Sequence, residues 1–293
     1  MMTETQVNYV RSIGPGLRSE GGLIRYPCGI STDDSSNIYV AFGPAGWVDK
    51  LDQQGKFLMG IGLGEGKWYK KVGKLGSPTG VAIDKSGNIY IADIKLDCIV
   101  KFNSQGHFMT YIGQSGTGDG EFNRPRSVHI DATGCLWVVD AYNHRIQKLD
   151  PEGKPLFKFG SKGVEDGNFN DPSDLTFDQS GGIYITDSGN ARVQKFDIEG
   201  KFILKFGKRG AGVGEIGSPR CIAIDGEHRL FIVDVWNNRV EVFDAMGNFL
   251  ISFGGSDKMG GQLNQPYGIA ITREKMVLLT DNQNHRILVF TYI

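Results

Sequence analysis

The fold is decided by one stretch, residues 125–160, which reads PRSVHIDATGCLWVVDAYNHRIQKLDPEGKPLFKFG. Its composition alternates segments rich in β-branched and aromatic residues with short turn segments. The stretch predicts four strands, at Arg126–Asp131, Cys135–Asp140, Arg145–Leu149 and Pro155–Phe159. Asp-x-x-Gly turns follow the first and third strands, because an Asp side chain can hydrogen-bond the backbone two residues on and Gly accepts a positive φ.

The same stretch recurs along the whole chain. A proline opens each copy, and successive prolines are 51, 47, 47, 47 and 47 residues apart. These prolines are Pro27, Pro78, Pro125, Pro172, Pro219 and Pro266. Fifteen residues after each proline stands an aspartate, except in the first copy, which has Phe42. Four antiparallel strands per repeat make one propeller blade, so the sequence predicts an all-β fold, a six-bladed β-propeller.

The two ends of the chain predict how the ring closes. The last copy has no fourth strand, whereas residues 7–14 resemble a fourth strand without its first three. We expect the N-terminal strand to complete the sixth blade, because this pairing removes a free sheet edge. Residues 1–293 are then expected to form a single propeller domain.

Composition excludes several classes of protein. Glycine accounts for 42 of 293 residues, which fits many tight turns. A net charge of −1 disfavours nucleic-acid binding driven by overall charge, although a local basic patch remains compatible with it. No apolar run approaches the ~20 residues of a membrane span, no signal-peptide pattern opens the chain, and the cysteines form no C-x-x-C pair. We expect a cytoplasmic monomer without membrane contact.

A motif at the turn from second to third strand connects the sequence to a family. Asp-x-x-Asn-x-Arg occurs in the third to sixth copies, at residues 140–145, 187–192, 234–239 and 281–286. The first copy has Phe42, Ala45 and Trp47 at these positions, and the second has Leu96 and Cys98 at the last two. Together with the Pro-x-Gly-[Ile/Val]-Ala-[Ile/Val]-Asp opening, this pattern resembles the NHL-repeat family of six-bladed propellers.

The resemblance implies the fold more strongly than the function, because propellers of this kind include both binding modules and enzymes. A motif that recurs in most blades is best explained by structure. We interpret its Arg as a fork that pairs with the Asp and with backbone carbonyls to hold adjacent blades together. Function should therefore lie where the copies differ from one another.

The copies differ most in the first strand of each blade, next to the axis. Small residues are expected there because the inner strands are crowded. Asp174 and Cys221 break this rule two residues after their prolines, and His129 breaks it four residues after its proline. We predict these three as catalytic candidates, with His129 as a base that Asp174 orients. The alternative is a filled channel in which arginines neutralise Asp174.

Further residues are predicted to bind a ligand. Beside the axis these are Arg126, Ser127, Arg220 and Tyr267. In the turns and in the long loop 62–78 they are Tyr142, Trp236, Trp68, Lys70 and Lys71. Lysines with interleaved aromatic residues can hold phosphates while they stack on bases. A solvated loop with aromatic rings packed at the rim is the alternative.

Two functions remain open at this point. One is a binding module that contacts a protein, an RNA or a small ligand through its top face. The other is a free-standing enzyme of lyase, hydrolase or cyclase type, with its site at the top mouth of the axial channel. Peptidyl-hydroxyglycine amidating lyases resemble this architecture and hold zinc with channel histidines. The inner strands here offer only His129, so we predict no metal and no cofactor.

Overall fold

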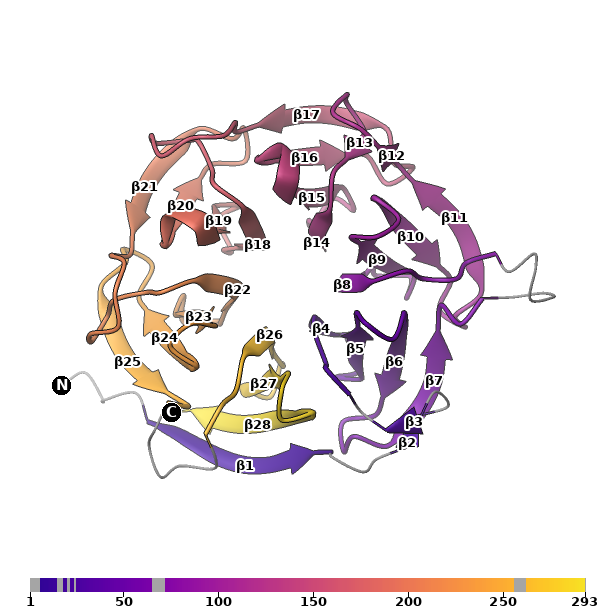
Figure 1. The fold of residues 1–293 in the computed structure, drawn as a ribbon, viewed down its shortest axis with the longest axis horizontal. Helices are drawn as coiled ribbons and strands as arrows, with labels where there is room; N and C mark the ends of the chain where they lie inside the picture. The colour runs from indigo at the N-terminus through magenta and orange to yellow at the C-terminus, as the bar shows by residue number, and fades with distance from the viewer. Residues whose placement is uncertain are drawn as a thin grey trace.

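The computed structural model describes residues 6–14, 18–19, 22–23, 25–64, 72–255 and 262–292. In this part of the chain, six four-stranded antiparallel sheets surround one axis, as Figure 1 shows. The predicted all-β, six-bladed propeller is confirmed. None of the described helices is long and apolar enough to cross a membrane.

In blades 1 to 5, the strands run from the axis to the rim in chain order. Blade 1 consists of β4 (Ile30–Thr32), β5 (Ile38–Phe42), β6 (Trp47–Leu51) and β7 (Phe57–Ile61). Blade 2 consists of β8 (Pro78–Ile83), β9 (Ile89–Asp93), β10 (Cys98–Phe102) and β11 (Phe108–Ile112). The innermost strands of these blades are therefore β4 and β8.

Blades 3 to 5 repeat the arrangement with little variation. Blade 3 consists of β14 (Pro125–Ile130), β15 (Leu136–Asp140), β16 (Arg145–Leu149) and β17 (Pro155–Phe159). Blade 4 consists of β18 (Pro172–Phe177), β19 (Ile183–Asp187), β20 (Arg192–Phe196) and β21 (Phe202–Phe206). Blade 5 consists of β22 (Pro219–Ile224), β23 (Leu230–Asp234), β24 (Arg239–Phe243) and β25 (Phe249–Phe253). The predicted strands of blade 3 are thus correct to within one residue at each end.

Blade 6 joins the two ends of the chain. Its inner strands are β26 (Pro266–Ile271), β27 (Met276–Asp281) and β28 (Arg286–Tyr292), and its outermost strand is β1 (Val7–Ile13). The antiparallel pairing of β1 with β28 sets Val7 opposite Tyr292 and Ile13 opposite Ile287. Figure 1 shows β1 at the rim beside β28. The predicted closure by the N-terminal strand is confirmed.

The hydrophobic core lies between neighbouring blades. In β15, Leu136 and Val138 belong to the apolar cluster shared with blade 2, whereas Trp137 and Val139 belong to the cluster shared with blade 4. This alternation follows from the two-residue period of a strand, which points successive side chains to opposite faces of the sheet. Each blade is therefore held on both faces, and the inner strands are fixed rigidly around the axis.

The repeated Asp-x-x-Asn-x-Arg motif forms part of this framework. Arg145 donates from Nε to Asp140 Oδ2 at 2.7 Å, and its other nitrogens donate to the carbonyls of Thr117 and Gly118, each at 2.7 Å. Those carbonyls belong to the loop that leads from blade 2 into blade 3. Arg192 repeats the arrangement with Asp187. The structural interpretation of the motif is confirmed.

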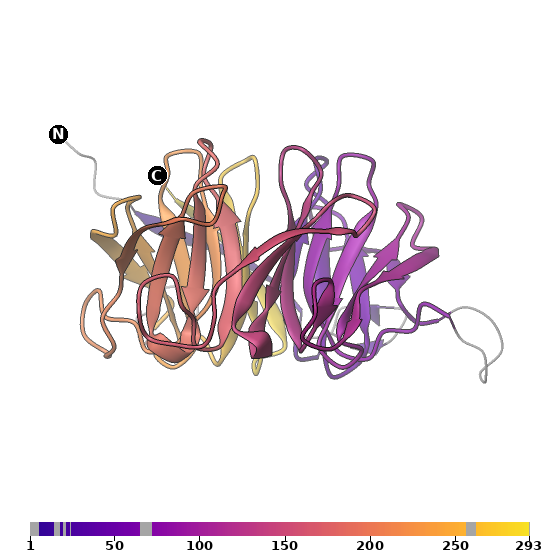
Figure 2. The ribbon, with the colours of Figure 1, turned by 90° about the horizontal axis from the view of Figure 1, so that it is seen from above.

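The loops from the second to the third strand meet the loops that join consecutive blades. The backbone N–H groups of Tyr142 and Gly189 donate to the carbonyls of Asn123 and Asn170 at 3.1 and 2.8 Å. Both kinds of loop therefore share one face, which we call the top face. The short helices η1 (Ala141–Asn143) and η2 (Ser188–Asn190) mark it on the lower side of Figure 2.

Candidate functional site

A cavity of about 300 Å³ lies in the axial channel, between the six inner strands. The structure brings most of the sequence-predicted site residues together in its wall. These residues are Arg126, Ser127, His129, Asp174, Arg220, Cys221 and Tyr267. All of them come from the four consecutive blades 3 to 6, so the ionisable groups among the predicted residues lie in these blades, whereas blades 1 and 2 contribute the hydroxyl groups of Ser31, Thr32 and Thr79.

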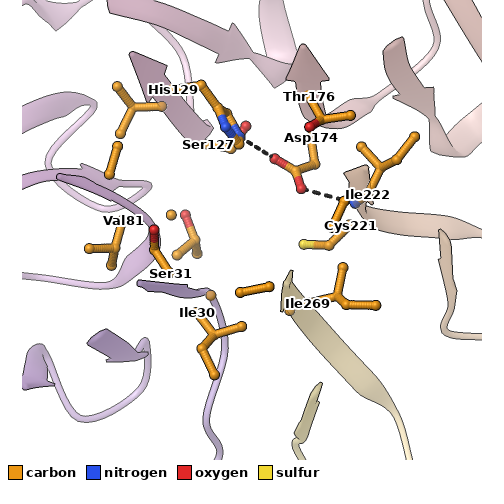
Figure 3. Close-up of a pocket in the computed structure, with 18 of the residues that line it drawn as sticks. Ile30, Ser31, Val81, Ser127, His129, Asp174, Thr176, Cys221, Ile222 and Ile269 are labelled. Carbon is orange, nitrogen blue, oxygen red and sulfur yellow. Dashed lines mark hydrogen bonds and ion pairs between the residues drawn. The ribbon is translucent and has the colours of Figure 1, made fainter. Parts of the chain in front are cut away.

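His129 and Asp174 form a hydrogen-bonded pair across blades 3 and 4. His129 Nε2 lies 2.7 Å from Asp174 Oδ1, as Figure 3 shows. The imidazole side chain is 30% exposed, whereas the carboxyl side chain is 9% exposed. An ionised carboxylate can only accept a hydrogen bond, so in the neutral imidazole Nε2 carries the ring proton and Nδ1 keeps its lone pair. Among the described residues, none forms a hydrogen bond with Nδ1, so the lone pair is free to act on a molecule in the cavity.

Asp174 is also fixed from its other side. The backbone N–H of Ile222 in blade 5 donates to Asp174 Oδ2 at 3.1 Å. The backbone N–H of Asp174 donates to Thr186 Oγ1 at 2.9 Å. One carboxylate therefore connects blades 3, 4 and 5, and its orientation toward His129 is set before any ligand binds.

A buried cluster of hydroxyl groups behind Asp174 was missed by the sequence analysis. Ser173 Oγ lies 3.0 Å from Thr186 Oγ1 and 2.7 Å from Ser188 Oγ, and it donates to the carbonyl of Arg220 at 2.6 Å. The signal was present in the register of the second strand. Thr186 stands where blades 3 and 5 have Val139 and Val233 and where blade 6 has Thr280, so only blades 4 and 6 have a hydroxyl group at this position.

Two guanidinium groups lie at the mouth of the cavity, on the side of the top face. Arg220 donates from Nη2 to the Tyr267 hydroxyl, and its guanidinium carbon lies 4.3 Å from the centre of the Tyr267 ring. Arg126 forms an ion pair with Asp171, with Nη1 2.8 Å from Oδ2. Burial and the positive charge of Arg220 lower the pKa of Arg126. The two arginines are thus close enough to repel each other.

The environment of Cys221 does not favour a thiolate. Burial raises the pKa of this thiol well above its ordinary value, and the negative charge of Asp174 adds to the effect. A reactive cysteine needs the opposite environment, in which a positive charge or a base lowers the thiol pKa. We therefore give Cys221 a lining role in the function proposed below, rather than the catalytic role considered from the sequence.

Ser127 occupies in blade 3 the position that Cys221 occupies in blade 5. Its side chain is buried, and its Oγ has no hydrogen-bond partner among the described residues. This oxygen is closed off from the cavity, so it does not offer a contact to a ligand in this conformation. Ser127, which was predicted as a ligand-binding residue, is one of the residues of the cavity wall.

Other predicted residues lie away from the cavity. Tyr142 and Trp236 are on the top face, 44% and 68% exposed. Arg124 lies over the Tyr142 ring at 4.6 Å, and Arg209 lies over the Trp236 ring at 5.6 Å. The remaining predicted residues, Trp68, Lys70 and Lys71, lie outside the described residues.

A second, smaller pocket adjoins the mouth on the top face. Its volume is about 260 Å³. It is lined by Arg220, Val235, Gln265, Tyr267 and Asn282. Because Arg220 and Tyr267 also line the axial cavity, these two side chains lie between the smaller pocket and the axial cavity. Within the described ranges, no group of three or more His, Cys, Asp or Glu residues is placed to hold a metal ion.

Comparison with known proteins agrees with this architecture. The family model described as NHL repeat matches residues 122–149 and 169–196, which include the second and third strands of blades 3 and 4. A comparison with curated proteins found no significant match.

Several solved structures share the fold. A streptogramin B lyase is 12% identical with a TM-score of 0.66, over 99% of this chain and 98% of that chain. A gluconolactonase from Xanthomonas campestris is 14% identical with a TM-score of 0.68, over 92% of this chain and 86% of that chain. A chain of a nidogen/laminin complex is 18% identical with a TM-score of 0.66, over 91% and 97%. Such identities show the fold alone. The chain is a six-bladed β-propeller that carries NHL repeats.

Proposed function

We propose that the protein binds a small polar molecule in its axial channel. The observation that carries this proposal is the cavity of about 300 Å³ in which His129, Asp174 and two arginines converge. Ligand sites have volumes of ~300–1,000 Å³, with a few polar groups that fix the orientation of the ligand. This cavity is at the lower end of that range, so it has room for a small metabolite.

Macromolecular recognition through the top face has less support. Tyr142 and Trp236 lie on blades 3 and 5, and each already has an arginine over its ring. Stacking on RNA bases needs an open aromatic face beside a continuous positive groove. We therefore keep contact with RNA or with a protein as an outcome of the binding test.

Binding can be tested with a thermal-shift panel of small polar metabolites, followed by calorimetric titration of the compounds that raise the melting temperature. Ala270 lines the cavity, so Ala270→Leu should reduce the affinity for any such compound at least tenfold by occupying part of the space. Ala132→Leu adds the same side chain at an exposed turn and should leave the affinity unchanged. Tight binding of a labelled single-stranded RNA, with no response to any small compound, would overturn the proposal.

The His129–Asp174 pair favours catalysis as a second function of the same site. His129 Nδ1 can remove a proton from a C–H or O–H group of the bound molecule, and the electron pair of the broken bond stays on that molecule. The resulting imidazolium is stabilised by Asp174, as a buried carboxylate stabilises the base in catalytic triads. A proton placed on Nδ1 can then be returned to the product.

This second function predicts a specific loss in Asp174→Asn. The amide oxygen can still accept from Ile222, but the amide N–H₂ would donate to Nε2 and force the proton onto Nδ1. We expect the exchange of deuterium from D₂O into small oxo and hydroxy acids, followed by NMR, to fall ~100-fold or more. His107→Gln, which changes an exposed histidine outside the cavity, should keep the wild-type rate. Equal exchange in Asp174→Asn and wild type would show that the pair has a structural role.

A further inference from the structure

We propose that the mouth of the axial cavity recognises a carboxylate, and that the ligand is a small organic acid held by Arg220 and Arg126. The inference rests on the proposed binding function and names its ligand class. The carboxylate lies toward the top face, and the rest of the molecule extends along the axis to His129 and Asp174. Tyr267 holds the Arg220 guanidinium in place.

The first argument is the missing counter-charge of Arg220. Two other buried arginines in this propeller have an acidic partner: Arg145 pairs with Asp140, and Arg192 pairs with Asp187. Among the described residues, none forms an ion pair with Arg220, whose direct contacts are the hydroxyl and the ring of Tyr267. The negative charge of Asp171 reaches Arg220, but that carboxylate already pairs with Arg126. A guanidinium in a half-buried site without an opposite charge is unfavourable, and an anionic ligand removes that cost.

The second argument is the balance of charge in the cavity wall. The wall contains two guanidinium groups, on Arg126 and Arg220, and one carboxylate, on Asp174. That carboxylate is already engaged by His129 and by the backbone of Ile222. The ion-pair partner of Arg126, Asp171, is 36% exposed and lies outside the cavity wall. Asp171 compensates Arg126, so Arg220 is the guanidinium of the wall that is left to pair with a monoanion.

The third argument is the spacing along β22. Arg220 and Ile222 are two residues apart on this strand, and a strand advances ~3.3 Å per residue. The pairing of β22 with β23 is irregular between Pro219 and Ile222, so the backbone of Arg220 is at most ~7 Å along the strand from the N–H group that holds Asp174. The atoms of a small acid that lie a few bonds from its carboxylate reach the level of His129. A planar carboxylate also fits the fork of a guanidinium better than a point charge does.

The experiment compares small carboxylic acids with their primary amides, which have nearly the same shape without the charge. Calorimetric titration of the wild-type protein should show that the acid binds at least tenfold more tightly than the amide. Arg220→Gln should abolish this preference, and Arg220→Lys should retain part of it. The matched control is Arg209→Gln, which removes an arginine that lies over an aromatic ring on the same face but outside the cavity wall. It should leave the preference intact.

The outcomes separate the two proposals. If amides bind as tightly as acids, the carboxylate assignment fails and the channel remains a ligand site. If no small compound binds at all, the proposed function itself fails. Inorganic phosphate is the third arm: stronger binding of phosphate than of any acid would overturn the carboxylate assignment. Loss of acid binding in Arg220→Gln supports the proposal only if its melting curve is cooperative, and Arg126→Gln provides a second variant, with a smaller expected loss of about threefold.

Discussion

The two halves of the ring have different kinds of residue at the same position of the inner strand. Blades 6, 1 and 2 have glycine two residues after the proline, and blades 3, 4 and 5 have Ser127, Asp174 and Cys221 there. A Cβ atom added at Gly29 would lie 2.0 Å from the carbonyl oxygen of Thr79, and one added at Gly268 would lie 2.5 Å from that of Cys28. In the glycine half the blades therefore meet backbone to backbone. In the other half, the Asp174 side chain connects blade 4 to blades 3 and 5.

This difference separates the residues that closure of the ring requires from the residues that give the channel its polar groups. The glycine half shows that a propeller of this size closes with no side chain at the position, so the fold does not require the polar residues of the other half. Asp174 replaces direct contact by hydrogen bonds to His129 and Ile222. Figure 3 shows Ile30, Ser31 and Val81 on the side of the cavity that faces the His129–Asp174 pair.

The largest effect on stability should come from a substitution that adds a side chain at a glycine of the inner strands. Gly29→Ala puts a methyl group against the backbone of the next blade, which cannot move without shifting the inner strand. We expect a loss of about 2–3 kcal/mol in the free energy of unfolding, measured by urea denaturation. Cys221→Ala, at the equivalent position in the other half, is the control. Equal stability of Gly29→Ala and wild type would show that the halves do not differ in packing.

A smaller effect on stability is expected when a polar residue of blade 4 is replaced by the apolar residue of the two neighbouring blades. Thr186→Val introduces the residue that blades 3 and 5 have at this position and removes the acceptor of the Asp174 backbone N–H. The free energy of unfolding should fall by about 1–2 kcal/mol, because a buried donor and the Ser173 hydroxyl lose a partner. Deuterium exchange should fall only a few-fold, because the Asp174 carboxylate keeps its own contacts. A loss of exchange as large as in Asp174→Asn would make Thr186 part of the reacting site.

Blade 5 differs from blades 3 and 4 in a way that pH should reveal. Glu241 stands where they have Gln147 and Gln194, whose amides donate to backbone carbonyls at 2.7 and 2.8 Å. Burial, with a contribution from Asp234, raises the pKa of Glu241 from 4.5 to about 7. The folded protein therefore keeps this proton between pH 4.5 and 7, so stability decreases as the pH rises through that window.

Glu241→Gln should remove this decrease. We expect the variant to gain about 1 kcal/mol relative to wild type between pH 5 and pH 8, a value reduced for screening. The measurement is the free energy of unfolding at several pH values. Parallel curves for variant and wild type over the whole range would mean that Glu241 does not titrate in the folded state.

The smallest effect concerns Cys221. Because burial and Asp174 raise the pKa of its thiol, iodoacetamide should modify Cys221 in the folded protein much more slowly than a free cysteine at pH 7.5. Cys221→Ala should keep the deuterium exchange of the wild type within about threefold. Rapid, stoichiometric alkylation of Cys221 that abolishes exchange would restore it as a nucleophile candidate.

Most of the fold could be predicted because the sequence motifs of the blades repeat at a regular spacing. Six prolines, and five aspartates at a fixed distance from them, specified the blades. The last copy lacks a fourth strand and the chain begins with an extra strand, and these two features specified the pairing of β1 with β28. Unlike these regular features, the hydroxyl cluster of Ser173, Thr186 and Ser188 was not anticipated. It joins the first and second strands of one blade to the next blade, so its members are recognised as a group only once the blades are aligned in space.

The sequence by itself determined the number of blades, the way the ring closes and the positions at which the copies disagree, because each of these depends on spacing along the chain. The tertiary structure decided which of those positions act together. His129 and Asp174 are 45 residues apart and meet because their blades are neighbours around the axis, whereas Tyr142 and Trp236 lie on the outer surface of the top face. Distances between blades, the cavity and the lack of a counter-charge at Arg220 arise from packing around the axis, which no single copy of the repeat contains.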